Sequence, residues 1–584
     1  MCYQAKLWLS LAVFLISHGA TAGTVVMPDT DPASGIRMEL ESWLEHTPQA
    51  GMLPVEWRVV NNSASPETWE LTTNSNRSYM GQGTIEGRYA MSVAAQSSGS
   101  MMIYIPIMPT SHSYGYQSVE WRISGVGMRR GGAFPNIGVS SSGTEYIAIG
   151  KEAAGNAGWK SLENEVNKAS STTRKASSTS LFGCEVDMKK APADWRGYSG
   201  LAQLWVSDRE WLGMLEMSRQ AVLDWVSMGG GKLFILTQDT GARELAGLKL
   251  AEGDKSRAIH GAGMVTRMQW DGSELPVGKM KEIVNRSGDD LKTALENYGS
   301  GWNMYKKIGL LKINAPLIFC FILVFGILVG PVNLFVFAGP GKRSRLFWTT
   351  PLISIGGSLL LMVLMVVQDG FGGRGIRQVL AVLQPDQKRL SVIQEQVSLT
   401  GILSNRAFER KEQDLMLPLL IDQKGSMTTS LYQESASERS GAWFTSRAIQ
   451  SHVSQAVRPS RAGVEFYPAK EADGAAEVIS TLEVPLQTLY VRDDEGVIWK
   501  ADSLETGERK ALTRVDGKSL TDWVANEVRD QSGPLINQAL DSALAQKGYV
   551  FAISTTAAPL AISSLDSIHW NEDKLIVVGP YVTP

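Results

Sequence analysis

The sequence is poor in cysteine and histidine, and neither sign of charge dominates it. Its 584 residues include three cysteines and six histidines and carry a formal net charge of −3. Cys2 lies at the extreme N-terminus and Cys320 in a long apolar run, so Cys184 alone remains for the polar regions. An intradomain disulfide is therefore excluded, and packed cores must stabilise the fold. The near balance of charge gives no electrostatic basis for nucleic-acid binding.

The few histidines and cysteines are not spaced for metal binding or nucleophilic catalysis. Five histidines lie after the N-terminal stretch that contains His18, namely His46, His112, His260, His452 and His569. None of them stands four residues from another histidine or beside a cysteine. Neither Ser199 nor Cys184 lies in a tight strand-to-helix turn that would activate a nucleophile. Residues 229–232 read Gly-Gly-Gly-Lys between a predicted helix and a predicted strand, the reverse of a phosphate-binding loop. The sequence predicts no catalytic residue, no metal and no cofactor.

Long apolar runs are present in the middle of the chain. Residues 313–338 and 346–367 are each long enough to cross roughly 30 Å of hydrocarbon as a helix. Residues 339–345 separate them and include three cations. The pattern predicts a two-helix transmembrane hairpin, which places the residues before it and after it on the same side of the membrane.

The N-terminus determines which side that is. Lys6 precedes an apolar stretch over residues 7–16, and Ala20-Thr21-Ala22 supplies the small residues of a signal-peptidase site. We expect residues 1–22 to be a signal peptide; if it stays uncleaved as an anchor, the topology does not change. Both large regions are then exported and the basic loop is cytoplasmic, as the positive-inside rule prefers, although Lys306, Lys307 and Lys312 flank the first span outside. We expect a protein of the bacterial cytoplasmic (inner) membrane.

Three exported regions differ in their patterns. Short alternating strands over residues 23–143 predict a β-sandwich, and strands alternating with helices over residues 144–300 predict an α/β domain with a parallel sheet. After a glycine-rich exit at residues 370–375, residues 376–584 predict a β-rich domain with a few helices. The predicted fold class is a multidomain α+β membrane protein.

Two segments resemble a known group of bacterial proteins. Residues 193–234, with Ala193-Asp194-Trp195-Arg196-Gly197-Tyr198-Ser199-Gly200-Leu201 at their start, resemble the class I glutamine amidotransferase-like (flavodoxin-like) domain of bacterial two-span membrane proteins. Gly330-Pro331-Val332-Asn333, the basic loop and Phe347-Trp348-Thr349-Thr350-Pro351 resemble the membrane hairpin of the same group. Catalytic members of the fold carry a Gly-x-Cys-x-Gly elbow and a downstream histidine. This chain lacks that elbow, so the resemblance implies the fold without glutamine hydrolysis.

The combined expectation is a non-catalytic envelope protein, anchored in the membrane, whose exported domains bind a protein partner or a small ligand. The alternative is a hydrolase or an auxiliary subunit of a membrane transport system that uses the α/β domain. Stable co-purification of an envelope partner favours the first, and activity lost on one point substitution favours the second.

The carboxyl ends of the predicted parallel strands are the place to expect a ligand. Open parallel sheets bind ligands in the crevice beyond these ends. Here the strand ends bring together a cation, a carboxylate and hydrogen-bonding groups: Lys151, Ser207, Asp208, Thr237 and Gln238. We predict that Lys151 and Asp208 line a shared cleft for a ligand or a partner loop. The competing interpretation is that these are ordinary polar loop residues.

Overall fold

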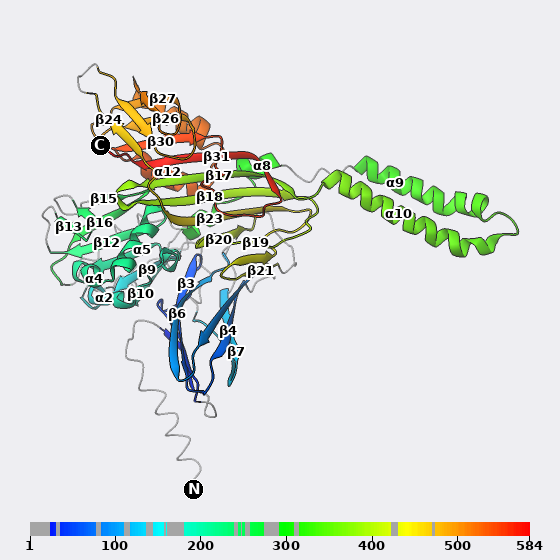
Figure 1. Ribbon diagram of the computed structural model, residues 1–584, viewed down its shortest axis with the longest axis horizontal. Helices are drawn as coiled ribbons and strands as arrows, with labels where there is room; N and C mark the ends of the chain where they lie inside the picture. The colour runs from blue at the N-terminus through cyan, green and yellow to red at the C-terminus, as the bar shows by residue number, and fades with distance from the viewer. Residues whose placement is uncertain are drawn as a thin grey trace, which may run out of the picture.

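The computed structural model describes residues 24–30, 35–77, 83–109, 117–135, 144–156, 159, 180–238, 243–246, 248–250, 257–273, 291–308, 315–421, 430–469 and 474–584. The predicted signal peptide lies outside these residues. The described part is multidomain: several packed β-sheets, one of them largely parallel, from which a two-helix hairpin projects (Figure 1).

The N-terminal region contributes strands to two sheets, and within each sheet these strands pair antiparallel. The first has the order β1 (Thr24–Thr30), β2 (Arg37–Ser42), β3 (Met52–Asn61) and β6 (Ser97–Pro106). The second contains β5 (Thr84–Val93), β4 (Glu67–Arg77), β7 (Gln117–Gly125) and β8 (Met128–Ala133) in that order. Alternation places Val55, Trp57 and Val59 of β3 in the core, each fully buried. The strands predicted in this region are present.

Three strands from far along the chain extend the second sheet. β21 (Leu431–Glu434) pairs in parallel with β5, and β22 (Glu438–Gly441) and β19 (Phe408–Glu409) follow it to the sheet edge. The sheet therefore has seven strands and joins the region before the hairpin to the region after it. The predicted division into residues 23–143 and 376–584 does not follow the sheets, because pairing over such a sequence separation leaves no local pattern.

The α/β region is built on a six-stranded sheet. Its order is β10 (Ser180–Val186), β9 (Thr144–Gly150), β11 (Gln203–Ser207), β12 (Lys232–Thr237), β16 (Gly263–Gln269) and β15 (Arg257–His260). The first five strands are parallel and β15 is antiparallel to β16. Numbered along the chain, the parallel strands run 2-1-3-4-5, the flavodoxin-like order, whose direction reverses between β9 and β11. The parallel sheet is confirmed; strand β10 was not predicted.

Short helices and one hairpin complete this region. They are α2 (Lys151–Asn156), the 3-10 turns η1 (Met188–Lys190) and η2 (Trp195–Tyr198), α4 (Asp208–Gly213), α5 (Glu216–Ser227), the pair β13 (Arg243–Leu245) and β14 (Leu248–Leu250), α7 (Leu291–Glu296) and α8 (Asn303–Ile308). The predicted loop at residues 170–180 lies outside the described residues up to Ser180, where β10 begins.

The hairpin consists of two helices that leave the body of the molecule side by side (Figure 1). The first is α9 (Ala315–Ile327), which continues as the π-helix η3 (Leu328–Phe337); after the turn η4 (Arg343–Arg345) the second is α10 (Leu346–Asp369). Ile318–Phe337 and Arg343–Leu364 are long and apolar enough to cross a membrane. Asn333 Nδ2 donates a hydrogen bond to Thr350 Oγ1 at 2.9 Å and links the two helices.

The chain returns from the hairpin directly into a nine-stranded sheet. Its order is β20 (Asp414–Leu419), β23 (Ile449–Pro459), β18 (Arg389–Thr400), β17 (Gly373–Gln384), β31 (Ile568–Pro580), β30 (Tyr549–Ser554), β26 (Leu486–Arg492), β27 (Ile498–Leu504) and β29 (Thr513–Val515). A three-stranded sheet contains β24 (Val464–Tyr467), β25 (Glu477–Ser480) and β28 (Arg509–Ala511). The helical elements are η5 (Pro385–Gln387), α11 (Gly517–Trp523), η6 (Val524–Val528) and α12 (Pro534–Leu544).

The predicted glycine-rich exit at residues 370–375 is only partly a linker. Strand β17 already begins at Gly373, and Gly373 N donates a hydrogen bond to Ser567 O at 3.0 Å. A Cβ on Gly372, which has a φ of +81°, would lie 2.3 Å from Ser567 O. Glycine is needed here because the backbone turns in a left-handed conformation against another segment.

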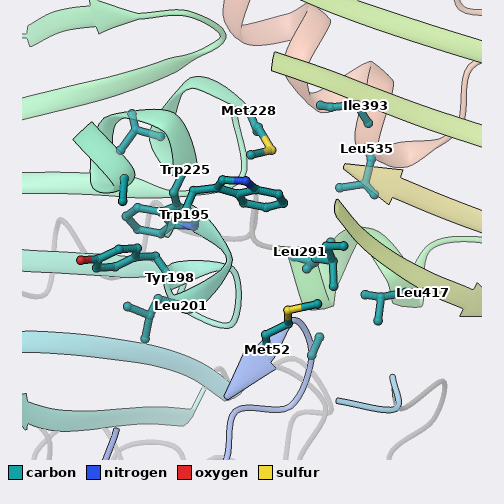
Figure 2. Close-up of a cluster of buried hydrophobic side chains, with 14 of the residues drawn as sticks. Met52, Trp195, Tyr198, Leu201, Trp225, Met228, Leu291, Ile393, Leu417 and Leu535 are labelled. Atoms are coloured by element: carbon teal, nitrogen blue, oxygen red, sulfur yellow. The ribbon is translucent and has the colours of Figure 1, made fainter. Parts of the chain in front are cut away.

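One buried apolar cluster runs through all the large regions. Figure 2 shows Met52 of β3, Trp225 of α5, Leu291 of α7 and Ile393 of β18 around the same space. The regions before and after the hairpin therefore pack as one body. If the two helices cross a membrane, both regions lie on the same side of it.

A buried carboxylate ties the segment before the hairpin to the C-terminal sheet. Glu395 of β18 accepts hydrogen bonds from Tyr298 Oη at 2.5 Å, Gly533 N at 2.5 Å and Ile536 N at 3.1 Å. The two backbone donors belong to the start of α12, where helix N–H groups lack partners. Burial raises the pKa of Glu395 to about 7, although these hydrogen bonds oppose the shift.

Candidate functional site

The reversal point of the parallel sheet is occupied by a side chain of the protein itself. Ser207 ends β11 and caps α4, since Glu210 N donates to Ser207 Oγ at 3.1 Å. The Glu210 carboxylate returns the bond, accepting from Ser207 N at 3.0 Å. This reciprocal capping box turns Glu210 back over the end of its own strand.

The same carboxylate also reaches the neighbouring strand. Glu210 Oε1 accepts a hydrogen bond from Glu152 N, in the first turn of α2 after β9, at 2.9 Å. A Cβ on Gly150, the last residue of β9, would lie 2.3 Å from Glu210 Oε2. Glu210 thus lies between the ends of β9 and β11, where a flavodoxin-like sheet would place a ligand. Burial raises the pKa of Glu210, and the backbone donors partly offset this effect.

The five predicted edge residues have partners within the protein. Ser207 Oγ donates to Glu152 Oε2 at 2.9 Å, and Thr237 Oγ1 donates to Asp208 Oδ2 at 2.8 Å. Lys151 Nζ lies 3.4 Å from Asp187 Oδ2, and Gln238 Nε2 donates to Asp271 O at 2.8 Å. The structure brings Asp208 and Thr237 together, while Lys151 and Gln238 contact other groups. The shared cleft of Lys151 and Asp208 stays a prediction.

Three side chains that could act as a nucleophile or a base, Cys184, His260 and His452, are buried. Cys184 lies within strand β10 and is fully buried. Burial lowers the pKa of His260 to about 4 and that of His452 to about 3, so both rings are neutral at pH 7. Across the described residues there is no cluster of three His, Cys, Asp or Glu side chains that could hold a metal ion.

One cavity lies on the nine-stranded sheet. It has a volume of about 640 Å³, and its lining includes Arg377 of β17, Trp570 of β31, Arg458 of β23 and the segment 558–566. A second cavity of about 310 Å³ lies between strand β6, Arg196 and residues 434–436. Lys411 and Glu412 line both cavities, so the segment around them separates the two.

A buried network of ion pairs holds this separating segment. Arg439 Nη1 lies 2.6 Å from Asp414 Oδ2, and Arg439 Nε lies 3.2 Å from Glu434 Oε2. Arg410 pairs with the same two carboxylates at 3.3 and 2.8 Å. Burial opposes the ionisation of Asp414, but the Arg439 and Arg410 guanidiniums hold its pKa below the usual range. Two cations therefore balance two anions in a site where the Arg439 side chain is fully buried.

Two cationic side chains of the larger cavity are held by carboxylates. The Arg377 guanidinium donates to both oxygens of Asp573, at 2.8 and 2.9 Å, and lies 4.9 Å from the centre of the Trp570 ring. The Arg458 guanidinium donates to both oxygens of Glu412 at 2.5 Å and to the carbonyl oxygens of Leu560 and Ala561.

Sequence reasoning missed Glu210 and the cavity for different reasons. Ser207-Asp208-Arg209-Glu210 is a Ser-x-x-Glu capping signature at a strand end, so Glu210 could have been found. The cavity residues come from four distant segments, and no local pattern marks them.

No family model matches this chain, and no curated protein matches it. Matching solved structures include a cycloisomaltooligosaccharide glucanotransferase from Paenibacillus sp., at 8% identity over 34% of this chain and 27% of the other, with a TM-score of 0.16. A calcium-binding mutant of Bacteroides uniformis β-glucuronidase 2 matches at 10% identity over 35% and 24%, with a TM-score of 0.12. An exo-chitosanase from Amycolatopsis orientalis matches at 10% identity over 84% and 75%, with a TM-score of 0.17. The matches thus span about a quarter of the first two enzymes, and no fold or activity is carried over at these TM-scores.

Proposed function

We propose that this chain is a non-catalytic envelope protein, anchored in the bacterial inner membrane, whose exported body binds a protein partner. The observation that carries the proposal is the position of the Glu210 carboxylate, which takes the backbone N–H groups of Ser207 and Glu152 at the strand ends. These donors are the groups that would hold an anionic ligand or intermediate in an α/β site. With them occupied, binding through the outer surface is the role that fits the domain best.

The placement in the membrane is supported by the shared sheet and by the charge of the hairpin loop. Because β5 and β21 pair in one sheet, the regions on either side of the hairpin must share a compartment. The loop between the helices carries Lys342, Arg343 and Arg345, all exposed, which favours a cytoplasmic loop.

Cysteine labelling of intact cells tests this topology. Ser92→Cys in β5 and Ser437→Cys beside β21 should react with a membrane-impermeant maleimide once the outer membrane is permeabilised. Ser344→Cys in the hairpin loop should react only after lysis, and the parent chain gives the background. Protection of Ser437→Cys after the outer membrane is permeabilised, with the inner membrane still intact, would contradict the proposed topology.

Exposed apolar side chains mark the surface that we propose for the partner. Leu212, Leu215 and Met217 lie at the turn between α4 and α5, beside the closed edge, and are 46%, 62% and 66% exposed. Apolar side chains gathered on a surface are typical of protein interfaces. The polar edge is thus closed while the turn next to it offers apolar contact area.

Co-purification from native membranes tests the partner. Leu215→Glu and Met217→Glu should each abolish capture of a defined envelope protein, while Val126→Glu, an equally apolar and 52% exposed position in the β7–β8 turn, should not. Equal capture by all three variants would remove this surface. Hydrolase activity of the purified chain, lost on one substitution, would instead favour the enzyme alternative.

A further inference from the structure

The larger cavity lies next to the point where the chain leaves the second apolar helix. Helix α10 ends at Asp369 and β17 begins at Gly373. In the parallel pairing of β17 with β31, Gly373 lies opposite Ile568 and Gly375 opposite Trp570. Ile568 and Trp570 both line the cavity. One wall is therefore built a few residues beyond the membrane helix.

The surface around this exit combines an aromatic ring with cations. Phe371 is 75% exposed and forms a bridge with Ile402. Arg374 and Arg406 are exposed, and neither forms an ion pair with a residue that the structure describes. Aromatic and cationic side chains at the end of a membrane helix are typical of contact with lipid headgroups.

Inside the cavity, the charges divide into those that are satisfied and those that are not. All three guanidinium nitrogens of Arg458 donate hydrogen bonds, to Glu412 and to two carbonyl oxygens. Two of the three guanidinium nitrogens of Arg377 donate to Asp573. Lys411 and Asp566 line the cavity and are exposed, and within the described residues neither has an ion-pair partner. Ser563 Oγ, also in the lining, is buried without a hydrogen-bond partner there.

The unsatisfied groups have both signs, which restricts the ligand. A purely anionic ligand would face the Asp566 carboxylate, and a purely cationic one would face Lys411 and Arg377. A molecule with a phosphate and an amine satisfies both signs, with the phosphate on the cations and Ser563 and the ammonium on Asp566. Trp570 and Leu565 add apolar surface for its carbon atoms, and about 640 Å³ is an ordinary volume for a small-ligand site.

We propose that this cavity binds the headgroup of a phospholipid that carries a phosphate and a primary amine. The proposal rests on the membrane placement given above and is independent of the protein partner. The site would bind the lipid headgroup near the end of α10, where the exported body meets the bilayer.

Lipid retention by the full chain tests the site. The purified protein is reconstituted in nanodiscs of phosphatidylethanolamine, phosphatidylcholine and phosphatidylglycerol, extracted, and weighed with its bound lipid by native mass spectrometry. Phosphatidylethanolamine should be retained over the other two, because choline cannot donate N–H bonds and glycerol has no amine.

Matched variants locate the binding. Lys411→Gln and Asp566→Asn should each lower retention about tenfold, the effect of losing roughly one charge-assisted hydrogen bond. Lys518→Gln and Asp522→Asn, both exposed in α11, should retain lipid like the parent chain. Equal retention of the three lipids, or no change in the Lys411 and Asp566 variants, would overturn the site.

An experiment with a water-soluble compound distinguishes a lipid headgroup from a free ligand with the same groups. If O-phosphoethanolamine binds the detergent-solubilised chain in calorimetry and displaces the lipid, a free phosphate–amine compound is the ligand class. Lipid retention without such binding assigns the site to the membrane lipid. Failure of the chain to enter nanodiscs would contradict the proposed membrane placement. Entry without headgroup preference would remove only the proposed site.

Discussion

The edge of the parallel sheet and the cavity on the nine-stranded sheet differ in how far the protein satisfies its own polar groups. At the edge, one carboxylate, Glu210, satisfies two strand ends, and each neighbouring polar side chain has a partner. In the cavity, Arg377 and Arg458 are satisfied, but Lys411 and Asp566 are left facing the same space.

The difference shows that a fold's usual binding place and a chain's open binding place need not coincide. The edge closes because capping residue and carboxylate come from one turn of one helix, three positions apart. The cavity stays open because the long side chains in its walls are bonded to carboxylates and do not extend across the space. Arg377, for example, is bonded to Asp573.

The largest effect is expected from the network that holds the segment between the two cavities. Arg439→Leu leaves Asp414 and Glu434 without their buried cation and should lower the free energy of unfolding by about 3–5 kcal/mol. Urea titration of the detergent-solubilised chain measures it. Arg509→Leu, which breaks an exposed pair with Glu477, should cost less than about 1 kcal/mol. Equal losses in the two variants would show that the network does not hold the cavity wall.

The next effect concerns pH, on the opposite face of the cavity's sheet. The pKa of Glu395 is about 7 in the folded protein, against an ordinary value of 4.5. Between pH 4.5 and 7 the folded state therefore binds a proton at Glu395 that the unfolded state has lost. Raising the pH through this window should lower the free energy of unfolding, with a slope of up to about 1.4 kcal/mol per pH unit. Glu395→Gln should remove that slope. The prediction is wrong if both proteins show the same pH profile from 4.5 to 7.

A smaller effect is expected where the edge is opened. Glu210→Ala removes the capping box and the acceptor for Glu152 N, and should lower the free energy of unfolding by about 1–3 kcal/mol. Acetate at high concentration should restore part of the loss by occupying the vacated position. Glu216→Ala, exposed in the first turn of α5, is the control and should show neither effect. Loss without acetate rescue would mean that the opened edge accepts no anion.

The smallest effect is expected at the predicted cleft residue Lys151. Its pair with Asp187 is 3.4 Å long with side chains 43% and 28% exposed, so Lys151→Ala should change the free energy of unfolding by less than about 0.5 kcal/mol. Partner capture should also be unaltered if the apolar turn alone carries it. Reduced capture by folded Lys151→Ala would return the polar edge to the binding surface.

Local patterns were sufficient for the parts of the fold that local interactions determine. Strands β9, β11 and β12, helix α5 and both apolar helices were predicted, because each has a periodic or uninterrupted apolar pattern. Strand β10 was missed, since its glycine, cysteine and glutamate interrupt such a pattern. The strand ends were located from the sequence, but whether their polar residues form a binding site stays a prediction. The cavity depends on tertiary contacts that leave no local sequence signal.

The pairing of β5 with β21 constrains the order in which the protein can be assembled. Gln433 Nε2 donates to Glu86 Oε1 across 347 positions of sequence, with the whole hairpin in between. At about 5–20 residues per second, synthesis leaves the edge of β5 without its neighbour for roughly 20–70 s. During that time the strand offers unpaired backbone groups to any extended segment nearby. The N-terminal sheet is completed only when β21, from the region after the hairpin, pairs with β5. A holding factor, or rapid insertion of the hairpin, would protect the β5 edge from wrong pairing until then.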